Sequence, residues 1–120
     1  MKRKFEYLDN FSNILDSKNI DSLLELLSED CLFQAGNNPI IKGKKEIKKT
    51  FETFYPLVKS VKHDIKDIFE SDDNLVQRGT VTYTRIDNTN LTVSVCDIFK
   101  IKDSKIVEYY IYIDWSELFK

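Results

Sequence analysis

The clearest structural signal lies in two neighbouring segments, LTVSVCDIFKI at Leu91–Ile101 and KIVEYYIYIDW at Lys105–Trp115. Both segments are rich in β-branched and aromatic residues, which favour strands. The polar residues 102–104 separate them and are typical of a turn. The sequence therefore predicts a long antiparallel hairpin.

Alternation along the first segment places Asp97 on an otherwise apolar face, shared with Val93, Val95, Phe99 and Ile101. An ionised carboxylate without a partner would be costly to bury there. Asp97 is therefore expected to be protonated, paired or part of a ligand site. The alternative is a buried acid that a neighbouring hydroxyl or backbone group satisfies.

Length and charge limit the classes of protein that this chain can belong to. With 120 residues, of which 42% are hydrophobic, residues 1–120 suit one domain with one core. A net charge of −2 gives no basic field for a nucleic-acid partner. Apolar runs are too short to span a membrane, and no apolar segment follows the basic residues 2–4. We therefore expect a cytoplasmic protein with no membrane partner.

Cysteine and histidine are scarce. Cys31 and Cys96 could pair in principle, but their spacing suggests no metal site, and reduced thiols are expected. The single His63 makes a transition-metal centre improbable, so we expect neither a metal nor a cofactor. His63 stands between Lys62 and Asp64, which favours an exposed side chain.

The remainder of the chain separates into a helical half and a strand half. Apolar spacing predicts helices over residues 3–16, from a cap at Asn19 or Asp21 to about residue 27, and from 44 to about 58 near Pro56. Alternation predicts strands over residues 31–35, 61–70 and 74–86 in addition to the hairpin. This segregation indicates an α+β domain, in which a curved, mainly antiparallel sheet around three helices forms a cone with a pocket at its mouth.

Several loose motifs occur in a recognisable order: IDSLLELLSED at Ile20–Asp30, PIIKG at Pro39–Gly43, GTVTYT at Gly79–Thr84, DIFKIKDSKI at Asp97–Ile106 and YIYID at Tyr110–Asp114. In this order they resemble the SnoaL-like branch of the nuclear transport factor 2-like superfamily. The resemblance covers nearly the whole chain and implies a cystatin-like cone that forms a homodimer. The superfamily includes ketosteroid isomerases, limonene epoxide hydrolases, polyketide cyclases, dehydratases and members without catalysis, so the fold does not settle the function.

The ketosteroid isomerase pattern is only partly present. Such an enzyme needs a carboxylate base, together with a tyrosine and a neutral aspartic acid that hold the oxyanion. The resemblance places Asp97 at the position of that aspartic acid. Phe11 stands at the tyrosine position and Ala35 at the position of the base.

The limonene epoxide hydrolase pattern is also incomplete. It requires an arginine between two aspartates, which activate water and protonate the epoxide. Arg78 matches the arginine, but Thr80 and Ile111 stand where the two aspartates are required. Neither mechanism carries over intact.

We expect Asp97, the candidate catalytic residue, to point into a largely apolar pocket. Its walls should raise the pKa of Asp97 unless Arg78 reaches the carboxyl group. The missing base slightly favours non-catalytic binding of a small apolar molecule; the alternative is an isomerase, cyclase or dehydratase that acts on a small substrate with a carbonyl or hydroxyl group. The residues expected to bind the ligand are Phe11, Phe33, Phe54, Tyr55, Arg78, Thr80, Val95, Phe99, Tyr109 and Ile111.

Strand parity also predicts an apolar outer face of the sheet, directed away from the helices. A small monomer rarely exposes so large an apolar surface, so we expect a homodimer through this face. The residues expected there are Val81, Tyr83, Cys96, Ile98, Tyr110 and Tyr112.

Overall fold

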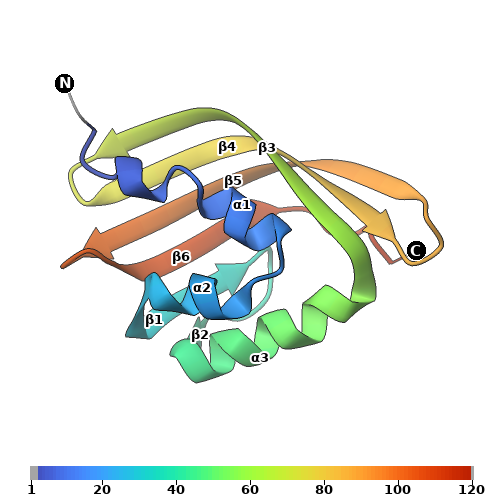
Figure 1. The fold of residues 1–120 in the computed structure, drawn as a ribbon, viewed down its shortest axis with the longest axis horizontal. Coiled ribbons are helices and arrows are strands. Elements are labelled where there is room, and N and C mark those ends of the chain that lie inside the picture. The colour runs from blue at the N-terminus through green and yellow to red at the C-terminus, as the bar shows by residue number, and fades with distance from the viewer. Residues whose placement is uncertain (1–2, 120) are drawn as a thin grey trace.

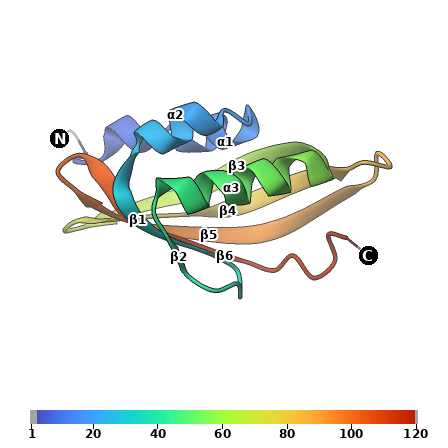
Figure 2. The same cartoon turned by 90° about the horizontal axis from the view of Figure 1, so that it is seen from below.

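The computed structural model describes residues 3–119 and shows helices packed on one face of a curved six-stranded sheet (Figures 1 and 2). The helical elements are the 3₁₀-helix η1 (Glu6–Leu8), the α-helices α1 (Phe11–Asp16), α2 (Ile20–Glu25) and α3 (Lys44–Phe54), and the 3₁₀-helix η2 (Tyr55–Leu57). The strands are β1 (Leu27–Ala35), β2 (Ile41–Lys42), β3 (Val58–Ser71), β4 (Asn74–Arg85), β5 (Asn90–Lys102) and β6 (Lys105–Ile113).

The strands lie in the order β2-β1-β6-β5-β4-β3. All neighbouring pairs are antiparallel except β1 and β6, which run parallel. The predicted hairpin is confirmed as β5 and β6. Asp103 and Ser104 at its turn have φ angles of 53° and 64°, the left-handed values that a two-residue turn with the twist of the strands requires.

The first predicted helix is divided into η1 and α1. Phe5, Leu8 and Phe11, which are all buried, are three residues apart, and this spacing suits the three residues per turn of a 3₁₀-helix. For the next helix the cap is Asn19, whose Oδ1 accepts a hydrogen bond from the backbone N–H of Ser22 at 3.1 Å. Helix α3 ends at Phe54, earlier than predicted, because Pro56 has no backbone N–H to continue the helical hydrogen bonds. The chain continues as η2 and becomes extended at Val58.

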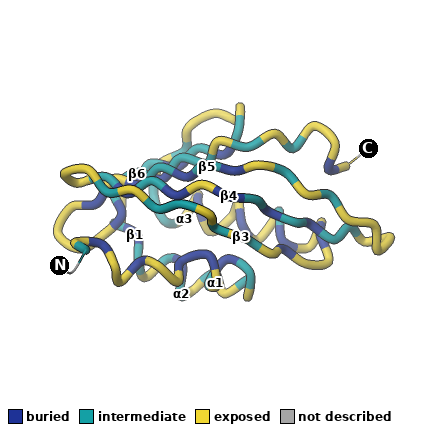
Figure 3. Tube along the Cα trace, turned by 90° about the horizontal axis from the view of Figure 1, so that it is seen from above, coloured by how far each residue is buried: buried dark blue, intermediate teal, exposed yellow. Residues whose placement is uncertain are grey.

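Buried residues alternate along the central strands (Figure 3). On β5 the predicted inner face is confirmed from Val95 to Ile101. On β4 the prediction was wrong: Val81 and Tyr83 face inward and are buried, since their cross-strand partners are Val93 and Leu91. Both faces of this strand carry β-branched or aromatic residues, so the sequence pattern does not show which face is buried. A shift of one residue in the assumed alternation exchanges the two faces.

Two further features of the described chain complete the fold. Neither Cys31, which is buried, nor Cys96, on the outer face, is in a disulfide. Among residues 3–119 no helix is long and apolar enough to cross a membrane.

Candidate functional site

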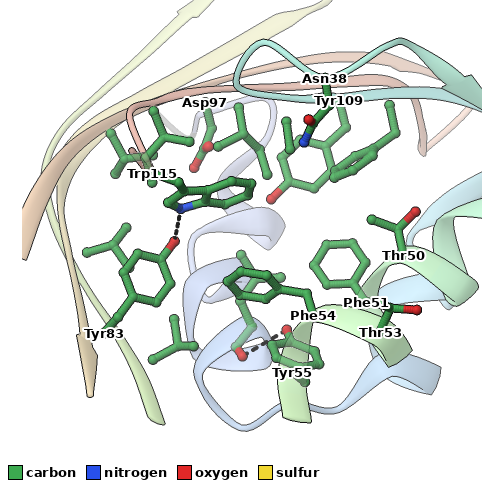
Figure 4. Close-up of a pocket in the computed structure, with 18 of the residues that line it drawn as sticks. Asn38, Thr50, Phe51, Thr53, Phe54, Tyr55, Tyr83, Asp97, Tyr109 and Trp115 are labelled. Atoms are coloured by element: carbon green, nitrogen blue, oxygen red, sulfur yellow. Dashed lines mark hydrogen bonds between the residues drawn. The ribbon is translucent and has the colours of Figure 1, made fainter. Parts of the chain in front are cut away.

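A cavity of about 420 Å³ lies between the concave face of the sheet, helix α3 and the segment after β6 (Figure 4). Its walls are mostly aromatic and aliphatic, with polar residues of α3 at one side. Within residues 3–119 no group of three or more His, Cys, Asp or Glu side chains is placed to hold a metal ion. The chemistry of this cavity therefore depends on single polar side chains set in apolar walls.

Asp97 on β5 is 1% exposed and supplies a carboxyl group to the cavity (Figure 4). Gln77, its direct partner on β4, donates a hydrogen bond from Nε2 to Oδ2 at 2.9 Å. The same Nε2 lies 3.4 Å from the hydroxyl of Ser12 on α1. Within the described chain Oδ1 has no hydrogen-bond partner. One carboxyl oxygen is therefore held by the protein and the other is left for a ligand.

Burial raises the pKa of Asp97 to about 6, against the opposing effects of the Gln77 hydrogen bond and the charge of His63. Arg78 makes no contact with it. A carboxyl group with this pKa exists in both protonation states near neutral pH, so it can donate or accept a hydrogen bond.

Tyr109 on β6 supplies a second polar group. Its ring is fully buried, stacked on Phe99 at 4.8 Å and packed edge-on against Phe11 and Phe33. Its hydroxyl has no hydrogen-bond partner among residues 3–119, and Figure 4 shows it directed into the cavity. Burial raises the pKa of this phenol well above its usual value, so the group is neutral. An unpaired buried hydroxyl costs about 1–3 kcal/mol, a penalty that a bound ligand could remove.

The structure places the residues that were predicted to bind a ligand in three different parts of the fold. Seven of the named residues line the cavity: Phe33, Phe54, Tyr55, Val95, Asp97, Tyr109 and Ile111. Phe11 and Phe99 are buried behind Tyr109 and support its ring instead.

Arg78 and Thr80 are corrections, because both lie on the outer face of the sheet. The Arg78 side chain is 60% exposed, and its Nη2 lies 2.6 Å from Oδ2 of Asp67. Thr80 pairs with Ser94 on β5, also away from the cavity. Gly79 and the inward Val81 flank Thr80, so its position follows from the same parity error on β4.

The sequence prediction did not include Tyr83 and Trp115, two of the aromatic residues that line the cavity. Trp115, after β6, donates a hydrogen bond from Nε1 to the hydroxyl of Tyr83 at 2.8 Å and stacks on Phe54 at 5.2 Å (Figure 4). Tyr55 contributes its ring alone, since its hydroxyl donates to the carbonyl oxygen of Leu15 at 3.0 Å. The sequence predicted Trp115 as the last residue of the second hairpin strand, but β6 ends at Ile113 and Trp115 lies in the irregular segment that follows.

The prediction of an exposed His63 was wrong. Its side chain is 8% exposed and lines the cavity, and Nδ1 lies 2.5 Å from Oδ1 of Asp16. The signal was present in the sequence, since His63 has the same strand parity as the buried Val61. The prediction instead relied on the charged neighbours Lys62 and Asp64, which lie on the opposite face of the strand.

A family model described as the SnoaL-like domain matches residues 8–109. No curated protein matches the chain. Similar solved structures include a nuclear transport factor 2-like protein of unknown function from Burkholderia pseudomallei, with 14% identity, a TM-score of 0.85 and coverage of 98% of this chain and 95% of that one.

Two further similar structures carry names that refer to enzymes. An LEH-like epoxide hydrolase of M. tuberculosis has 18% identity and a TM-score of 0.78, with coverage of 93% of this chain and 83% of that one. A putative SnoaL-like polyketide cyclase of Shewanella putrefaciens has 13% identity and a TM-score of 0.83, with coverage of 98% and 94%. At these identities the likeness concerns the fold. Together with the match over residues 8–109, it shows that this chain belongs to the SnoaL-like family within the nuclear transport factor 2-like fold.

Proposed function

We propose that the chain binds a small, largely apolar molecule in this cavity and anchors an oxygen atom of that molecule with Asp97. The observation that carries the proposal is the free Oδ1 of a carboxyl group that is only 1% exposed. Tyr109 supports it, because its unpaired hydroxyl comes from the adjacent strand and the same face. In the register of β5 and β6, Tyr109 pairs with Phe99, two residues from Asp97.

These two groups suit a carbonyl or a hydroxyl oxygen. A carbonyl oxygen can accept hydrogen bonds from the neutral Asp97 carboxyl group and from the Tyr109 hydroxyl. A ligand hydroxyl can instead donate to the ionised carboxylate. The apolar body of the ligand would lie against Phe33, Phe54 and Trp115, where each Å² removed from water contributes roughly 25 cal/mol.

An isomerase, cyclase or dehydratase acting on a carbonyl- or hydroxyl-bearing substrate is the second candidate. It is favoured by the pKa of about 6 of Asp97, which suits proton transfer near neutral pH. The names of two structures with this fold, an epoxide hydrolase and a putative polyketide cyclase, are consistent with chemistry in such a cavity. Proton abstraction from carbon would require a base in addition to Asp97.

The test is a binding titration with two bicyclic probes, 2-naphthol and 2-tetralone, followed by NMR of the isotopically labelled protein. We expect both to shift resonances of cavity residues. Asp97→Leu and Tyr109→Phe should each weaken binding about tenfold or more, because each removes a hydrogen bond in a dry site. Tyr112→Phe is the matched control, since Tyr112 is 56% exposed and lies outside the cavity. Equal affinities in all four proteins would refute the anchor.

A further inference from the structure

The cavity contains a second polar contact that ligand anchoring does not use. Asp16, the last residue of α1, faces His63 on β3. Its Oδ1 lies 2.5 Å from Nδ1 of His63, and its Oδ2 accepts a hydrogen bond from the backbone N–H of His63 at 2.9 Å. The two contacts hold both the ring and the carboxylate in place.

This contact determines which nitrogen of the ring carries the proton. An ionised carboxylate can only accept, so the hydrogen between the two groups belongs to Nδ1 of His63. In the neutral ring, Nε2 then carries the lone pair. Within residues 3–119 Nε2 has no hydrogen-bond partner, while the side chain lines the cavity. A free imidazole lone pair beside an apolar ligand site is the arrangement of a general base.

We propose that His63, oriented by Asp16, is a proton acceptor that removes a proton from the carbon next to a carbonyl group of the bound molecule. Asp16 is a positioning residue in this scheme. The inference rests on the proposed function, because the carbonyl oxygen must lie at Asp97 and Tyr109. It supplies the base that the incomplete isomerase and hydrolase patterns lack.

The step balances without a co-reactant. Nε2 of His63 takes the proton, the C–H bond breaks, and its electron pair forms a carbon–carbon double bond. The carbonyl π electrons move to oxygen, which takes the proton of the neutral Asp97 carboxyl group, giving an enol, an imidazolium and a carboxylate. Return of both protons regenerates the ketone. When the imidazolium first exchanges its proton with D₂O, a deuteron returns to carbon and the net change is replacement of C–H by C–D. If the enol is conjugated and the proton returns to a different carbon atom, the net reaction is an isomerisation.

A purely structural role for Asp16 is the competing explanation, because the carboxylate also ties α1 to β3 through the backbone of His63. Asp16→Asn separates the two roles. An amide oxygen can still accept the backbone hydrogen bond, but the side chain no longer carries the charge that holds the hydrogen on Nδ1. Asp64→Asn is the matched control, since Asp64 is the neighbouring residue, exposed and paired with Lys66.

The first measurement is the tautomer of His63 by ¹⁵N NMR after histidine labelling, in which one ring gives the whole signal because the chain has a single histidine. At about pH 8 we expect hydrogen on Nδ1 in the wild type and in Asp64→Asn, and a shift of hydrogen toward Nε2 in Asp16→Asn. A wild-type ring with its hydrogen on Nε2 overturns the inference.

The second measurement is the exchange of the C1 protons of 2-tetralone in D₂O, followed by ¹H NMR. We expect the wild-type protein to accelerate exchange, a loss of about 100-fold or more in His63→Gln, and a loss of about tenfold or more in Asp16→Asn. Asp64→Asn should match the wild type.

The two failures are distinguishable. If 2-tetralone binds with the Asp97 dependence described above but exchanges equally fast with wild type and His63→Gln, the base assignment is wrong and ligand anchoring stands. If 2-tetralone leaves the cavity resonances unchanged up to its solubility limit, the anchoring of ketones fails, and with it the base assignment.

Discussion

Asp97 makes the stability of the protein depend on pH. Its folded pKa of about 6 lies above the ordinary value of 3.8, so the folded state favours the protonated form. The stabilising contribution is complete below about pH 4 and is lost as pH rises through 6. The difference between these two pKa values corresponds to about 3 kcal/mol in the free energy of unfolding.

Asp97→Asn should remove this pH dependence, because an amide of the same shape does not titrate. We expect the free energy of unfolding of the wild type, relative to the variant, to fall by about 3 kcal/mol between pH 4 and pH 8. Urea unfolding at several pH values measures the difference, in which all other titrating groups cancel to first order. Parallel stability curves would show that Asp97 titrates normally.

Tyr109 offers a separate test of the apo cavity. Tyr109→Phe removes a buried hydroxyl that has no partner, so we expect the free protein to be equally stable or up to about 1 kcal/mol more stable. The same change at a hydroxyl with a partner, Tyr55→Phe, should lower stability by about 1 kcal/mol, since it removes the bond to Leu15. Thermal unfolding of both variants provides the measurement. A destabilised Tyr109→Phe protein would indicate a hydrogen bond to an ordered water.

At the scale of strands, the sequence predicted elements better than it predicted which face of them is buried. The β5–β6 hairpin was predictable because its inner face is apolar over Val95, Phe99 and Ile101, with Asp97 as the single exception. On β4 both parities suit a strand, so only the pairing of Val81 with Val93 identifies the buried face.

The candidate site was predictable where strand periodicity determined it. Asp97 and Tyr109 followed from the hairpin alone. The contact between His63 and Asp16 could not be predicted in the same way, because it joins α1 to β3 across 47 residues. Its formation depends on how the helix docks on the sheet, which local patterns do not specify.

At the scale of strands, Gly79 on β4 is the position where we expect one added carbon atom to lower the stability of the protein. A Cβ there would lie 2.0 Å from the backbone oxygen of Asp64 and 2.8 Å from Cα of Ile65, next to an irregularity in the pairing of β3 and β4. Gly79→Ala must push β3 away, and we expect a loss of about 1–3 kcal/mol. Because Asp64 follows His63, the variant should also disturb the His63 ring signal in NMR.

Urea unfolding measures the effect, with Thr80→Ala on the outer face as the control that changes the adjacent residue without a clash. A Gly79→Ala protein of wild-type stability would mean that β3 can move at little cost.

At the scale of the whole molecule, the outer face of the sheet carries an apolar band across four strands. The register aligns Phe69 on β3, Val76 on β4, Ile98 on β5 and Tyr110 on β6 in one row. Tyr112 lies beside the row, and both it and Phe69 are more than half exposed. The predicted members Val81 and Tyr83 are replaced by Phe69 and Val76, so the apolar surface remains although its composition differs.

We therefore propose that two copies of the chain associate through this band, which would bury apolar side chains that one copy leaves in water. Light scattering at micromolar concentration should give twice the chain mass of 14.1 kDa. Ile98→Lys places a charge at the centre of the band and should yield the monomer mass, because an unpaired ammonium group is costly to bury. Glu52→Lys, at an exposed position of α3 on the other side of the sheet, should leave the dimer intact. A monomeric wild type, or a dimer that tolerates Ile98→Lys, would exclude this face as the interface.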